Sequence, residues 1–71
     1  MDFYVCLLFN SVDGAIVRAE IIACARKADC IPRANELLRQ SAEAGGYELW
    51  LRGEKVYSSF TNQNGNSSQT G

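Results

Sequence analysis

The chain has 71 residues, a formal net charge of −1 and no histidine. A chain of this length forms one small domain, and its seven basic residues are too dispersed to form a stripe that binds nucleic acid. Histidine is the commonest general base and metal ligand, so the composition argues against an enzyme, a metal site and a bound cofactor.

The first predicted element is a strand over 3–9, which is apolar on both faces and therefore suits the centre of a sheet. The Asp13-Gly14 pair predicts a tight turn, and 15–22 predicts the second strand. With a two-residue turn, Ile21 faces the core and Ile22 faces the opposite side. A longer loop would shift the pairing by one residue and exchange the faces of one strand.

A helix is predicted next, because a stripe of residues, all but one of them apolar, recurs at spacings of three and four. They are Ala28, Ile31, Ala34, Leu37, Leu38 and Ser41. Proline is tolerated in the first turn of a helix, so Pro32 predicts a regular helix from Cys30, with Asp29 as N-cap and a looser turn before it from Arg26. Gly45-Gly46 is predicted to end the helix with a left-handed cap.

The stretch 47–60 has the pattern of a β-hairpin, with two alternating runs on either side of Gly53-Glu54. A two-residue turn with Gly first makes Trp50 and Tyr57 a cross-strand aromatic pair on one face. The other face then presents apolar side chains to the helix. They are Tyr47, Leu49, Leu51, Val56 and Phe60.

The predicted order of elements is ββαββ, an α+β fold. A right-handed crossover between the second and third strands leaves room for the first strand between them. This gives a four-stranded antiparallel sheet in the order 2-1-3-4 with one helix on one face, the alternative being a swap in strand order. The predicted domain covers 1–60. Residues 61–71 contain no apolar side chain and no charge, which predicts a disordered polar tail.

The run 15–59 resembles a group of short, functionally uncharacterised bacterial proteins. The shared features are the Asp13-Gly14 hairpin, the Ala19-Glu20 strand, an Ala/Arg-rich helix with Leu37-Leu38, and the Glu48-Leu49-Trp50 strand. Two features depart from that pattern, namely Arg26-Lys27 in place of an acidic pair and Pro32 in place of a helix former. The resemblance implies a ββαββ fold and no activity.

Because one helix covers only one face of a four-stranded sheet, the other face is predicted to be an exposed apolar surface. Its predicted interface residues are Val5, Leu7, Phe9, Trp50 and Tyr57. The preferred hypothesis is a non-catalytic interaction module that forms a homodimer through this face or binds another protein. The alternative is a small-molecule or anion-binding regulator that uses Glu48, Trp50 and Tyr57.

The three cysteines are predicted to be small buried hydrophobes of a cytoplasmic protein. Cys30, near the helix start and close to basic residues, is the candidate for a reactive thiol, which would make the protein an enzyme or redox sensor. A disulfide between Cys24 and Cys30 is sterically possible but has no oxidising compartment to favour it. The start of the chain lacks the basic region of a secretory signal, and the apolar run 3–9 is too short to span a membrane.

Overall fold

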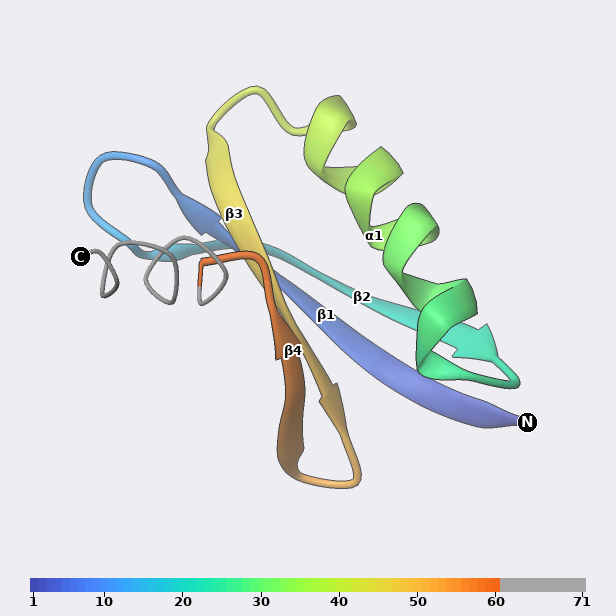
Figure 1. Cartoon of the computed structure of the whole chain (residues 1–71). Helices are drawn as coiled ribbons and strands as arrows, with labels where there is room; N and C mark the ends of the chain where they lie inside the picture. The colour runs from blue at the N-terminus through green and yellow to red at the C-terminus, as the bar shows by residue number, and fades with distance from the viewer. Residues whose placement is uncertain (61–71) are drawn as a thin grey trace, which may run out of the picture.

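The computed structural model describes residues 1–60 and shows four strands and one helix (Figure 1). The elements are β1 (Asp2–Asn10), β2 (Ile16–Cys24), α1 (Lys27–Gln40), β3 (Ala44–Leu51) and β4 (Glu54–Ser58). The predicted polar tail, 61–71, lies outside the described residues. No helix within residues 1–60 has the length and apolar character needed to cross a membrane.

The strands form one antiparallel sheet in the order β2-β1-β3-β4, as predicted. β1 lies in the middle and pairs with β2 along one edge and with β3 along the other. The helix connects β2 to β3 and packs on one side of the sheet, over β2, β1 and β3 (Figure 1). The predicted α+β, ββαββ architecture is therefore confirmed.

The register of the first hairpin differs from the predicted two-residue turn. The Asn10 amide donates to the Ala15 carbonyl over 2.7 Å, so the loop holds four residues, and the Asn10 side chain accepts from the Val12 amide. A bulge between Leu8 and Phe9 adds a further irregularity. The loop and the bulge together move the pairing by one residue. Ile22, opposite Tyr4, is therefore buried, and Ile21 is exposed, which reverses the predicted faces.

The turn of the second hairpin is also one residue away from the predicted position. Leu51 pairs with Glu54, so the two turn residues are Arg52 (φ 51°) and Gly53 (φ 80°) rather than Gly53 and Glu54. Two positive φ angles are the geometry of a type I′ turn, whose twist matches that of the flanking strands. Only glycine adopts such angles without a steric cost, and Gly53 supplies one of them.

Gly53→Ala is expected to lower the free energy of unfolding by about 1–2 kcal/mol, because alanine at positive φ is strained. Gly53→Asn is expected to cost less, since asparagine tolerates the left-handed region. Urea denaturation followed by circular dichroism measures both. Equal losses for the two variants would contradict this account of the turn.

The helix begins at Lys27, three residues before the predicted start, and the N-cap is Arg26 rather than Asp29. Pro32 consequently lies inside the helix, where it removes one backbone hydrogen bond. Burial of Cys30 and Ala34 against the sheet holds the helix in place despite that loss. The helix ends at Gln40, and the predicted cap glycines, Gly45 and Gly46, belong to β3 instead.

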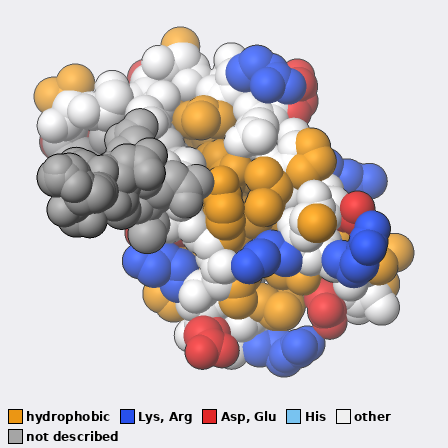
Figure 2. Space-filling view, in the orientation of Figure 1, with side chains coloured by type: hydrophobic (Ala, Val, Ile, Leu, Met, Phe, Trp, Pro, Cys, Tyr) orange, Lys and Arg blue, Asp and Glu red, His pale blue; other side chains and the backbone are white. Residues whose placement is uncertain are grey.

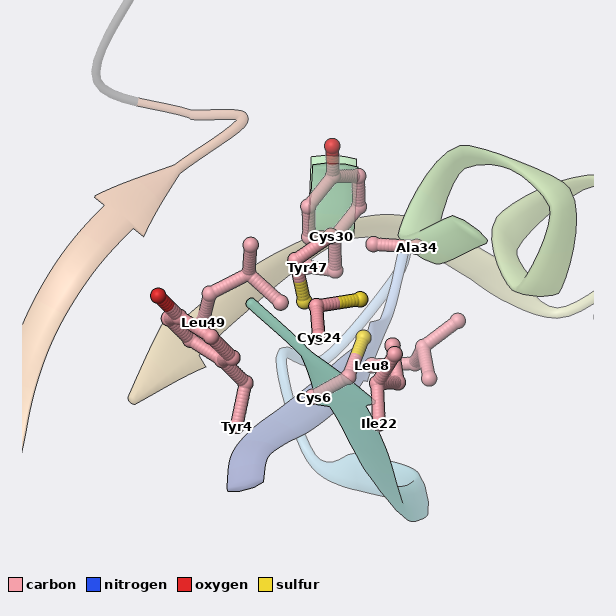
Figure 3. Close-up of a cluster of buried hydrophobic side chains, with 9 residues drawn as sticks. All are labelled: Tyr4, Cys6, Leu8, Ile22, Cys24, Cys30, Ala34, Tyr47 and Leu49. Carbon is pink, nitrogen blue, oxygen red and sulfur yellow. The ribbon is translucent and has the colours of Figure 1, made fainter. Parts of the chain in front are cut away.

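The core lies between α1 and the sheet (Figure 3). Alternate residues of β1 point into the core, together with apolar residues of β2, β3 and α1. The buried side chains are Tyr4, Cys6, Leu8, Ile22, Cys24, Cys30, Ala34, Tyr47 and Leu49. The hydroxyl of Tyr47 donates to Asn35 Oδ1 over 2.7 Å, which satisfies the polar end of a ring that is otherwise buried.

Candidate interaction face

The side of the sheet that faces away from α1 is called here the open face. Since Cys6 and Leu8 are buried beneath the helix, the alternate residues of β1 lie on the open face, and the strand register adds their neighbours. Its apolar members are Phe3, Val5, Leu7, Phe9, Ile16, Ala19, Ile21, Ala23 and Trp50. Four of the five predicted interface residues, Val5, Leu7, Phe9 and Trp50, thus lie on one surface.

These side chains form cross-strand rows. Ile21, Val5 and Trp50 make one row, in which Val5 pairs with both of the others. Exposure is high along the rim of the face, with 65% for Phe3, 64% for Ile21 and 56% for Ile16. Apolar side chains so exposed and so close together are unusual on a monomer.

Two charged residues on the open face neutralise each other. Glu48 accepts a hydrogen bond from the indole Nε1 of Trp50 over 3.0 Å, and its other oxygen lies 3.7 Å from Lys55 Nζ. The polar atom of the indole is thereby satisfied. The face consequently presents apolar surface with no unbalanced charge from this pair.

Tyr57, the fifth predicted interface residue, lies on the other side of the sheet. A bulge between Leu49 and Trp50 pairs Tyr57 with Leu49, so its ring packs against the core, with its centroid 5.9 Å from that of Tyr47. The predicted Trp50–Tyr57 pair is therefore wrong. An extra residue in one strand turns all later side chains to the opposite face.

The same bulge places the residues of the predicted ligand site on two sides of the sheet. Glu48 and Trp50 lie on the open face, and Tyr57 does not.

On the helix side, α1 leaves β4 partly uncovered, and Leu51, Val56 and Tyr57 are only partly buried there. Figure 2 shows hydrophobic side chains gathered between α1 and the β3–β4 hairpin, with charged side chains around them. A hydrogen bond from Lys27 Nζ to the Val56 carbonyl, 3.2 Å, links the start of the helix to β4 across this flank.

Phe60 was predicted to face the core but lies at the end of the open face. Its ring packs edge-on against Phe9, with centroids 6.0 Å apart, and covers Gly46 so closely that a Cβ there would lie 2.4 Å from the ring. Gly46, near the start of β3, thus makes room for an aromatic side chain that follows β4. The prediction missed this contact because the bulge beside Trp50 moves Phe60 to the other face.

Phe3 and Ile21 are two exposed residues of this face that are absent from the predicted interface residues. Side chains alternate along β1, so the sequence alone could have placed Phe3 on the same face as Val5 and Leu7. Ile21 could be placed only with the correct loop length. Both lie at the rim of the face.

All three cysteines are free and buried. Burial raises the pKa of the Cys30 thiol to about 12, and the neighbouring Cys24 adds to the effect. Burial likewise raises the pKa of Cys6 to about 11. These thiols therefore stay protonated near neutral pH, and Cys30 does not have the thiolate character predicted for a reactive cysteine.

The structure shows two shallow hollows beside these features. One lies between β2 and α1, near Ile22 and Leu37, and the other lies at the end of the open face, near Phe9 and Phe60. Neither brings Trp50 and Tyr57 together. Within residues 1–60, no group of three or more acidic, cysteine or histidine side chains is arranged to hold a metal ion.

Comparisons with protein-family models, with curated proteins and with solved structures find no match for this chain. The role of the open face is therefore inferred from its own geometry.

Proposed function

We propose that the protein is a non-catalytic interaction module whose open face binds the open face of a second copy. The observation that carries this proposal is the exposure of Phe3, Ile16 and Ile21 beside the half-buried Val5, Leu7 and Trp50. Burying apolar surface is the main driving force of association, at about 25 cal/mol per Å². We further propose that it acts in the cytoplasm, where its cysteines stay reduced.

The size of the face supports a second copy as the occupant. The four strands have nine, nine, eight and five residues, so their mean length is about 26 Å, and at about 4.8 Å spacing the sheet is about 19 Å wide. The projected area is on the order of 500 Å², and the side-chain relief adds to it. Two such faces packed together bury about 1,000 Å² in total, which is at the lower end of specific interfaces.

Charge and symmetry also favour a second copy. The Glu48–Lys55 pair is balanced within one subunit, so two faces related by a two-fold axis meet without repulsion from these groups. Two twisted sheets pack face to face with their strands about 30° apart, and the apolar rows of the two faces interdigitate. A domain of about 60 residues buries only about 60% of its unfolded surface, so the dimer also enlarges a small core.

Ile21→Glu is expected to weaken the dimer at least about tenfold, because each subunit then places a carboxylate in an apolar interface. The side chain is 64% exposed in one subunit, so the fold itself tolerates the change. Sedimentation equilibrium of the full chain measures the dissociation constant, and circular dichroism verifies that the variant is folded.

Val12→Glu is the matched control. Val12 is 91% exposed but lies in the β1–β2 loop, away from the open face, so the same change there leaves the dissociation constant unaltered. A wild-type chain that stays monomeric at hundreds of micromolar would overturn the proposal, and so would equal weakening by both variants.

A further inference from the structure

Two of the three buried thiols lie near each other at the junction of β2 and α1. Cys24 is the last residue of β2, Cys30 lies in the first turns of α1, and Cys24 is the nearby thiol that, after burial, adds most to the raised pKa of Cys30. Figure 3 shows their sulfur atoms together with that of Cys6 at the centre of the buried cluster. Cys24 is 5% exposed, whereas Cys6 and Cys30 are completely buried.

We propose that Cys24 and Cys30 are the site of an intramolecular disulfide that forms on exposure to a peroxide. The two sulfur atoms belong to one buried cluster, so a change of side-chain rotamer brings them to bonding distance. The connection between them is short, so their backbones stay close throughout. Cys6 comes from the middle of the central strand β1, where the sheet holds its backbone on both sides.

The first turns of α1 offer a route for the oxidant. The N-cap residue, Arg26, makes no side-chain cap hydrogen bond, and Pro32 removes a backbone donor from the helix. The residues before Cys30, from Lys27 to Asp29, are exposed. Local opening of a poorly capped helix end costs less free energy than global unfolding, so this segment exposes its thiols first.

The chemistry balances with a peroxide as the oxidant. The Cys24 sulfur, the more exposed of the two, loses its proton and attacks one oxygen of hydrogen peroxide. The O–O bond breaks, a sulfenic acid forms and one water leaves. The Cys30 sulfur then attacks the sulfenic sulfur, the S–S bond forms and a second water leaves. Two thiols give up two electrons, and one peroxide is reduced to two waters.

The disulfide joins the end of β2 to the start of α1. It restricts the unfolded chain while leaving the core side chains in their native places, so the oxidised protein is expected to melt about 10 °C higher than the reduced one. In a reducing cytoplasm such a bond is transient, which is the usual behaviour of disulfides in that compartment.

Peptide mapping of the full chain tests the proposal. After treatment with hydrogen peroxide and alkylation of the remaining thiols, trypsin cuts between Arg26 and Ala28 and separates Cys24, on 19–26, from Cys30, on 28–33. The expected product is a linked pair of these two peptides, from a chain that runs as a single subunit on a non-reducing gel. Cys6, on 1–18, is expected in its alkylated form.

Cys6→Ala is the matched control and is expected to keep the link, whereas Cys30→Ala is expected to lose it. Three results would each overturn the proposal. They are a link through Cys6, a link between two chains, and oxidation to sulfinic or sulfonic acid without a link. A linked chain that melts below the reduced chain would also overturn it, because the bond would then not fit the native arrangement.

Discussion

Ile22→Ala is expected to lower the free energy of unfolding by about 2–4 kcal/mol, whereas Ile21→Ala costs less than about 1 kcal/mol. Ile22 is 7% exposed and packs beneath α1, so truncation leaves a cavity in the core. Ile21 is on the open face of the same strand. For a domain of this size, the first loss is a large fraction of the total stability.

Each variant serves as the control for the other, because both remove the same atoms from adjacent positions of one strand. Urea denaturation at concentrations below those at which the dimer forms separates the effect on folding from any effect on association. Larger destabilisation by Ile21→Ala would show that the two-residue turn is correct and that the register described above is not.

Stability is expected to fall steeply in alkaline solution because of the buried thiols. Burial and, for Cys6, the nearby Glu20 raise its pKa to about 11, and burial together with Cys24 raises that of Cys30 to about 12, both from 9.0. Above pH 9 the unfolded chain releases protons that the folded chain keeps, so unfolding becomes more favourable as the pH rises. Stability is full below pH 9 and is lost progressively up to about pH 11 for Cys6 and about pH 12 for Cys30.

The expected loss between pH 7 and pH 10 is between about 1 and 3 kcal/mol, since one pKa unit corresponds to about 1.4 kcal/mol for each thiol. Urea denaturation in the presence of a reducing phosphine measures it. In Cys6→Ala the loss should be about half as large, each variant being compared with its own stability at pH 7. A free energy of unfolding that is flat from pH 7 to pH 10 would contradict burial of these thiols.

Much of the fold could be predicted from local patterns. Because β1 is apolar on both faces, it was predicted to be a central strand. A single stretch with helical spacing between two pairs of strands indicated one crossover connection. Together they led to the order β2-β1-β3-β4, which the structure confirms. Four of the open-face residues followed from this arrangement, because side chains alternate along β1 and β3 whatever the loops do.

The predicted start of α1 was three residues too late. A helix that buries Cys30 and Ala34 tolerates Pro32 in its interior, so the expectation that proline marks the first turn placed the start of α1 too late. Tertiary burial outweighed a local preference there.

The sequence by itself determined the number, type and order of the elements, because hydrophobic period and turn residues are local properties. Only the tertiary structure decided which side of the sheet each side chain of β2 and β4 occupies. The four-residue loop after Asn10 and the bulge beside Leu8 together shift β2 by one residue, and the turn at Arg52-Gly53 and the bulge beside Trp50 together shift β4 by one residue. Since side chains alternate with a period of two, each shift moved a residue such as Ile22 or Tyr57 to the other side of the sheet.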